Sequence, residues 1–276
     1  MHSNSNERQI SHGRRAWLYL WTAAVLAFLV APSLIVIPMS FSASNLLEFP
    51  PSTLSGRWYA SYFSSSEWMR ATAISLSTAL LTVLIATPVG FLAAYAVART
   101  TPRLGSVATA IIVLPTILPH IVVAVGMFFV LSWAGLINTI TGLTIGHVVV
   151  ALPFVFVVML SALKSYDFSQ EKAAVSLGAS QFRAVVDITL PQLKMSLVTA
   201  ALLAFISSID EVIISMLVST GSASTLSRRM LVSLTDVIDP TIAAISTLFI
   251  LVTVSVIVIV QLTGNRSALV PGGTER

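Results

Sequence analysis

The 276-residue sequence has no cysteine and few charged residues, which make up 9% of the chain. Without cysteine, the chain can form neither a disulfide framework nor a zinc site with thiolate ligands. The hydrophobic fraction is 56% and the mean hydropathy is +0.92, far from the values of a soluble domain. This composition indicates an integral membrane protein whose main solvent is lipid.

Enzyme motifs are also missing. The sequence contains no Gly-x-Ser-x-Gly elbow, no His-Glu-x-x-His pair and no phosphate-binding Gly-Lys-Ser loop. We therefore expect no catalytic residues, no metal site and no cofactor. The formal charge of +4 does not indicate a nucleic-acid partner, because the basic residues are scattered over short segments between apolar runs.

Long apolar segments are what the sequence has in abundance. Each is long enough to cross about 30 Å of hydrocarbon at about 1.5 Å per residue, and unpaired backbone groups are not tolerated in lipid, so each is predicted to be a helix. The fold class is therefore all-α, with six transmembrane helices. The predicted spans are 17–40, 71–98, 106–131, 143–163, 195–219 and 241–262.

The basic residues predict the orientation of these spans. A cytoplasmic amino terminus places eleven of the fifteen Lys and Arg residues inside, in agreement with the positive-inside bias. We expect a cytoplasmic N-terminal tail (1–16), a transmembrane domain (17–262) and a cytoplasmic C-terminal tail (263–276). The first apolar stretch is about twice the length of a signal-peptide core, which favours a retained anchor.

One predicted cytoplasmic connection, residues 164–194, is long and rich in helix-forming polar residues. Ser169 is a candidate N-cap for a short helix that runs to about Leu177. Gly178 suits a left-handed turn after that helix, because it has no Cβ to clash. A second short helix is expected from 180 to 189, with Pro191 directing Leu190 away from helical geometry.

In this connection the sequence resembles the permease subunits of bacterial ABC importers. Their signature is Glu-Ala-Ala, a glycine six residues after the glutamate, and a closing Ile-x-Leu-Pro. Here Lys172 stands at the usual glutamate position, and Glu171 precedes it by one residue. The matching residues are Ala173, Ala174, Gly178, Ala179, Ile188, Leu190 and Pro191.

The resemblance implies the type I (MetI-like) permease fold, with a cytoplasmic coupling helix that docks on a separate ATP-binding subunit. It assigns the coupling role to Glu171, Lys172 and the matching residues from Ala173 to Pro191. Without the resemblance, the same segment reads as an amphipathic interfacial helix that connects two spans.

The fifth predicted span contains two carboxylates, Asp210 and Glu211. A carboxylate at membrane depth costs at least a few kcal/mol, so each needs a partner or water. Successive residues of a helix point about 100° apart, so we expect at most one of the pair to face a pore. Two interpretations stay open: an ion pair or hydrogen bond with another helix, or an anionic lining that attracts a cationic substrate.

The third predicted span contains Pro115 and Pro119, one helical turn apart, followed by His120. Each proline frees a carbonyl one turn back, and broken helices commonly border transport pathways. His120 is a candidate for the substrate path. A lone histidine is also commonly a hydrogen-bonding partner of a neighbouring helix, and no second histidine lies at metal-ligand spacing.

The later spans resemble the spermidine and putrescine branch of these importers. That branch carries a similar Ser-x-Asp-Glu stretch in the fifth span, and Ser208 therefore joins Asp210 and Glu211 as a candidate path residue. Many polyamine permeases have glutamate where His120 stands. The other shared residues are Thr225, Leu226, Arg228, Asp239 and Pro240.

The predicted function is that of a transport subunit in the inner membrane, moving a small solute, with a polyamine as the favoured substrate. Alternative solutes are an opine, an amino acid derivative or an aminophosphonate. A stand-alone secondary carrier is the alternative class, but it would need internal repeats and its own ion site. The resemblance implies three partners: a dimer of ATP-binding subunits, a second and related permease that forms a heterodimer with this chain, and a periplasmic solute-binding protein. The loop around Arg228 would meet either the binding protein or the partner permease.

Overall fold

The computed structural model describes residues 16–236 and 238–265, and these are mainly helical. They divide into two compact units. The first contains the residues up to Tyr62 and those from Ile238 onward, and the second contains Phe63–Val237. Of the predicted tails, residues 1–15 and 266–276 lie outside the described residues. The first unit contains α1 (Ala16–Met39) and α13 (Thr241–Asn265). The boundary between the units falls within α2 (Arg57–Ser64).

In the first unit, α1 packs along α13. The connection after α1 is held by its own polar side chains. Ser40 Oγ lies 2.7 Å from the hydroxyl of Tyr59 on α2, and Glu48 accepts hydrogen bonds from the side chains of Ser42 and Ser52, both at 2.9 Å. Those bonds and one from the Ser52 backbone lower the pKa of Glu48.

The second unit is built around three helices, α3, α6 and α10, whose contacts form its main core. Small residues such as Ala86, Ala151 and Ala200 are fully buried there, which lets the helix backbones approach closely. The helices are α3 (Ser66–Ala98), α4 (Pro102–Ile117), α5 (His120–Trp133), α6 (Ile140–Lys164), α7 (Ser169–Ser176), α8 (Gln181–Ala184), α9 (Leu190–Gln192), α10 (Lys194–Ile209), α11 (Ile213–Val218) and α12 (Leu226–Asp236).

Each of the six predicted spans falls on one or two of these helices. Among the described residues, α1, α3 and α6 are individually long and apolar enough to cross a membrane, and up to five spans result if each bent helix pair counts as one. The described apolar part of α13, Thr241–Ser255, is shorter. The structure is thus a membrane-spanning helical fold.

Two predicted spans are not continuous helices. The span 106–131 is bent by 100° between α4 and α5, at Leu118 and Pro119. Leu118 is extended there (ψ 145°), as expected for a residue before proline. The span 195–219 is interrupted at 210–212, where α10 ends and α11 has not begun. The prolines of the third span predicted a broken helix at the first of these places, whereas the interruption at 210–212 was not predicted.

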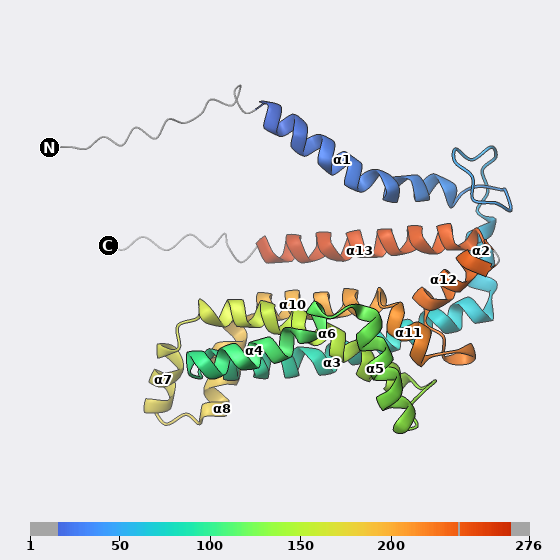
Figure 1. The fold of residues 1–276 in the computed structure, drawn as a ribbon. Coiled ribbons are helices and arrows are strands. Elements are labelled where there is room, and N and C mark those ends of the chain that lie inside the picture. The colour runs from blue at the N-terminus through green and yellow to red at the C-terminus, as the bar shows by residue number, and fades with distance from the viewer. Residues whose placement is uncertain (1–15, 237, 266–276) are drawn as a thin grey trace. The chain divides into compact units, whose positions relative to one another are not determined.

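The second unit has two distinct ends (Figure 1). At one end, α7 and α8 lie beyond the last residues of α3 and α6, Ala98 and Lys164. At the other end lie α11 and α12. Arg229 on α12 pairs there with Glu67 in the first turn of α3. The connection 164–194 is therefore separated from α11 and α12 by the length of the core helices.

Gly90 allows the close approach of α3 and α6. A Cβ at Gly90 would lie 2.5 Å from Cγ1 of Val155, whereas a Cβ at Gly126 on α5 would have no atom within 4 Å. We expect Gly90→Val to destabilise the fold by about 1–3 kcal/mol through overpacking. The matched variant Gly126→Val should change the unfolding temperature of the solubilised protein much less. Equal shifts for both variants would contradict this packing.

Candidate functional site

The first short helix of the 164–194 connection, α7, begins one residue earlier than the sequence predicts. Phe168 occupies the N-cap position, and Ser169 is the first helical residue. The Asp167 carboxylate accepts hydrogen bonds from the Ser169 hydroxyl at 2.7 Å and backbone amide at 2.9 Å. These bonds lower the pKa of Asp167. Asp167 thus fixes the chain direction into α7, a role that sequence reasoning gave to Ser169.

The bend after α7 is at Gly178, as predicted. Its φ is +98°, in the left-handed region, and Ala179 N donates to the Ala174 carbonyl at 3.1 Å. Ser180 then caps α8 by accepting from Arg183 N at 3.2 Å. The chain reverses at Gly178 and returns alongside α7, which gives the two predicted short helices.

The end of the connection differs from the prediction. A π-helical turn spans Val185–Thr189, and Leu190 is helical (φ −60°, ψ −44°) rather than extended. The wide π turn gives the ring of Pro191 room against the preceding carbonyls, so the chain stays helical through Gln192. It bends by 79° before α10. Pro191 therefore marks a bend between helical segments.

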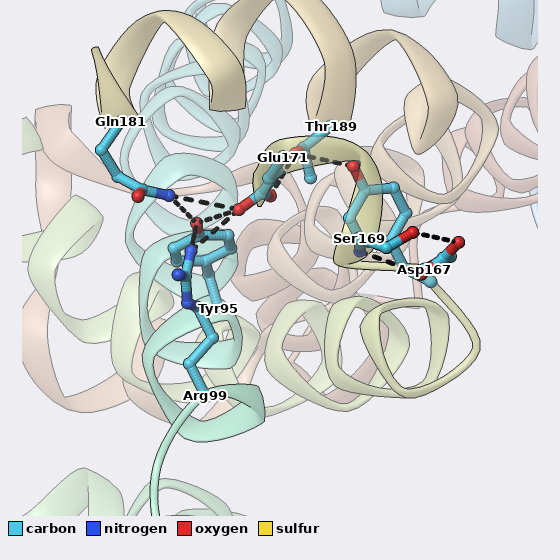
Figure 2. A network of polar contacts seen from close by, with 8 residues as sticks. Tyr95, Arg99, Asp167, Ser169, Glu171, Gln181 and Thr189 are labelled. Atoms are coloured by element: carbon cyan, nitrogen blue, oxygen red, sulfur yellow. Dashed lines mark hydrogen bonds and ion pairs between the residues drawn. The ribbon is translucent and has the colours of Figure 1, made fainter. Parts of the chain in front are cut away.

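Glu171 is the centre of a buried polar network (Figure 2). Its side chain is 2% exposed. Oε2 accepts from the Tyr95 hydroxyl at 2.7 Å, from Arg99 Nη1 at 2.8 Å and from Gln181 Nε2 at 3.2 Å. Oε1 accepts from the Thr189 hydroxyl. The carboxylate thus joins α3, α7, α8 and the π turn.

Sequence reasoning did not identify Tyr95, Arg99 or Thr189. Tyr95 and Arg99 are four residues apart and share one face of α3, with the guanidinium 5.1 Å from the Tyr95 ring centroid. That spacing, at the predicted cytoplasmic end of a span and opposite a glutamate-bearing loop, was the available signal. The partner of Tyr95 and Arg99, which is Glu171, could not be identified without knowing how the connection folds around the bend at Gly178.

The outer face of the connection includes two large apolar side chains that are mostly exposed. Leu177 is 90% exposed and Phe182 79% exposed. Lys172 and Ala173 are also exposed, whereas Glu171 points into the network. Leu177, Phe182 and Lys172 are therefore exposed on the connection, while Glu171 holds the connection to the core.

A second feature is an open acidic pocket of about 560 Å³ in the second unit. It brings His120, at the start of α5, together with Asp210 and Glu211, at the break after α10. Both carboxylates line this pocket, whereas the sequence predicts that at most one of the pair faces a pore. Asp210 ends α10 as its C-cap, and Glu211 follows outside the helix. The remaining lining residues are Val150, Phe154, Leu203, Ile206, Ser207, Val212 and Ile213.

The two carboxylates differ in their surroundings. Glu211 is 8% exposed, and its Oε1 accepts from Ile214 N at 2.9 Å, in the first turn of α11. Asp210 is exposed. Within residues 16–236 and 238–265, neither forms an ion pair with a basic side chain. The pocket therefore carries acidic charge that this part of the chain does not neutralise.

Ser208, a predicted path residue, does not line this pocket. It is 4% exposed and its Oγ lies 2.7 Å from Nδ1 of His147 on α6. His147, near the start of α6, is itself 2% exposed. In the described part of the chain, no three His, Cys, Asp or Glu side chains are grouped to hold a metal ion.

At the opposite end from the 164–194 connection, a smaller pocket of about 320 Å³ is lined by Glu67, Arg70 and Arg229 together with the 221–224 turn. The Arg229 guanidinium lies 4.9 Å from the Trp68 ring centroid. Arg228, which the sequence places in a partner contact, donates to Ser224 Oγ at 3.2 Å. This end therefore presents basic side chains on an ordered helix.

Comparison with known proteins places these features in a family. Residues 86–267 match the family described as binding-protein-dependent transport system inner membrane component. The spermidine/putrescine transport system permease protein PotC of Haemophilus influenzae is 28% identical over 254 residues, covering 92% of this chain and 97% of the relative. The putrescine transport system permease protein PotI of Escherichia coli K12 is 29% identical over 245 residues, covering 86% of each.

A solved structure shares the fold. The crystal structure of a bacterial ABC transporter involved in the import of the acidic polysaccharide alginate superposes with a TM-score of 0.70 at 16% identity, covering 92% of this chain and 98% of that one. At that identity the match concerns the fold alone.

The Glu171 network predicts the response of the loop to mutation. Arg99→Leu leaves a buried carboxylate with fewer donors, and we expect a loss of about 1–3 kcal/mol, reduced by the partial exposure of Arg99. The loop should then open more often, and trypsin should cleave after Lys172 or Arg183 faster. Mass spectrometry of timed digests measures this rate.

The matched control is Asp187→Asn, which removes the exposed i,i+4 pair between Asp187 and Arg183. Such pairs contribute about 0–0.5 kcal/mol, so the digestion rate should stay nearly unchanged. Equal acceleration in both variants would refute the special position of Glu171.

Proposed function

This chain belongs to the family of binding-protein-dependent transport system inner membrane components, and on that premise we propose that it is the permease subunit of an ABC importer for polyamines. It is a multi-pass protein of the inner membrane. The acidic pocket formed by Asp210, Glu211 and His120 carries the substrate part of the proposal.

The chemistry of the pocket suits an alkyl polyamine. Such a solute has ammonium groups separated by methylene chains, and the pocket combines two carboxylates with an apolar wall that includes Phe154 and Leu203. A carboxylate in low dielectric attracts a cation strongly. The alternative solutes, an opine or an aminophosphonate, carry anionic groups that two unpaired carboxylates would repel. Relatives that transport spermidine and putrescine support the same choice.

The 164–194 connection is proposed to receive the motion of an ATP-binding subunit. Its exposed apolar residues, Leu177 and Phe182, fit the few anchors that dominate an interface, while Lys172 lies beside them. Glu171 is assigned a different part in this coupling: it holds the docking segment to α3. ATP hydrolysis belongs to the separate subunit.

The remaining partners follow from the same proposal. A second permease completes the pathway, and a solute-binding protein delivers the polyamine at the end of the second unit that carries Arg70 and Arg229. The binding-protein-dependent character of the family supports that last partner. In this arrangement the 164–194 connection and both termini are cytoplasmic.

The absence of cysteine makes the orientation directly testable. Single cysteines at Leu177 and Ser222 report on opposite ends of the second unit, because both residues are exposed. In intact spheroplasts, a membrane-impermeant maleimide should label the Ser222→Cys variant and leave Leu177→Cys unlabelled until the membrane is opened. The reverse pattern would invert the proposed topology and remove the docking role.

The substrate assignment is tested in proteoliposomes containing the permease, its partner permease and the ATP-binding subunits, supplied with loaded binding protein. Putrescine or spermidine should stimulate ATP hydrolysis and be taken up. Asp210→Asn removes one carboxylate charge from the path. A charged hydrogen bond contributes about 1.5–3 kcal/mol, so uptake should fall roughly tenfold or more.

The matched control is Asp210→Glu, which keeps a carboxylate at the same position of the pocket. Its uptake should exceed that of Asp210→Asn, because the negative charge that attracts the cation is retained. Stimulation by an anionic solute but not by either polyamine would overturn the substrate while leaving the importer assignment in place.

A further inference from the structure

A buried histidine lies directly behind the acidic pocket. His147 on α6 is 2% exposed and is not among the residues that line the pocket. Its Nδ1 lies 2.7 Å from Ser208 Oγ in the last turn of α10, and its Nε2 lies 3.2 Å from Ser215 Oγ on α11. The ring therefore contacts both α10 and α11, which are separated by the break at 210–212.

The hydrogen bonds around this ring reach three other elements. Ser215 Oγ donates to the Glu211 carbonyl at 2.9 Å, so it accepts from Nε2–H of His147. On the other side of the ring, Ser208 Oγ lies 2.7 Å from Nδ1 and also donates to Thr82 Oγ1 on α3 at 3.4 Å. Both ring nitrogens are used, which fixes the plane of the imidazole relative to the break.

The two serines flank the acidic break on both sides. Between Ser208 and Ser215 lie Asp210, the C-cap of α10, and Glu211, which precedes the start of α11 at Ile213. Such a connection between two helices has more conformational freedom than a helix unless its ends are held. His147 holds both ends to the same point of α6.

The contact between α6 and α11 is also close beside His147. A Cβ at the neighbouring Gly146 would lie 2.7 Å from Cγ2 of Ile214. The absence of a side chain at Gly146 therefore lets α11 approach α6 closely enough for the bond between His147 and Ser215. The position of the break depends on this approach as well as on the polar contacts.

We propose that His147 is a positioning residue of the substrate path: it pins the Asp210–Glu211 break to α6, so that both carboxylates face the pocket and receive the cationic solute together. This inference rests on the proposed function. His147 acts through the carboxylates and does not itself touch the solute, because it lies outside the pocket lining.

The test compares His147→Leu in the unmodified background and in the Asp210→Asn background. The full transporter is reconstituted with saturating putrescine-loaded or spermidine-loaded binding protein, and polyamine uptake and ATP hydrolysis are measured together. His147→Leu alone should lower uptake about tenfold while ATP hydrolysis stays within about twofold. In the Asp210→Asn background, His147→Leu should lower uptake further by less than about twofold, because coupled residues are not additive.

Conservative variants add a graded response. His147→Gln retains an amide donor that reaches Ser215 and should recover roughly a third of the uptake. Ser215→Ala removes only the α11 contact and should lower uptake about threefold. If the His147 variants do not assemble, Ser215→Ala is tested instead in the unmodified and the Asp210→Asn backgrounds.

Two results would overturn the inference. One is an equal fold-loss of uptake from His147→Leu in both backgrounds, which would show an effect independent of the carboxylates. The other is a parallel loss of ATP hydrolysis, which would indicate a general structural role. If Asp210→Asn leaves uptake unchanged, the cation pocket of the proposed function fails. If Asp210→Asn lowers uptake and His147→Leu acts independently, only the role of His147 fails.

Discussion

A polar group that is removed from water must find its partner within the protein, and this constraint shapes both candidate sites. Glu171 satisfies it with donors from α3, α8 and the π turn, and so fixes the 164–194 connection on the core. His147 satisfies it with serines from α10 and α11. In each case the need to pair one buried side chain places several helices relative to one another.

The acidic pocket exists because two helices are broken. α5 starts at His120 after the bend at Leu118, and α10 stops at Ile209, so the pocket is lined at points where the backbone is not continuously helical. Irregular backbone at membrane depth is tolerated where it borders a cavity or is buried in protein. Glu211 offsets part of this cost by accepting from the buried backbone amide of Ile214, in the first turn of α11.

The sequence was sufficient for the helices and the bend at Gly178, because apolar length and a positive-φ glycine are local properties. It was insufficient for the break at 210–212, since the apolar residues on both sides read as one span. The partners of Glu171 and His147 were also missed. Tyr95 is 76 residues from Glu171 and Ser208 is 61 residues from His147, so no local pattern pairs them.

The two candidate sites lie at opposite ends of one helix, α10. α10 begins at Lys194, immediately after the connection held by Glu171, and ends beside the acidic break at Asp210. A helix of 16 residues spans about 24 Å and transmits displacement as a rigid element. Its far end is joined to α6 through Ser208 and His147. The break, rather than α10 itself, is therefore the place where such a displacement would change the pocket.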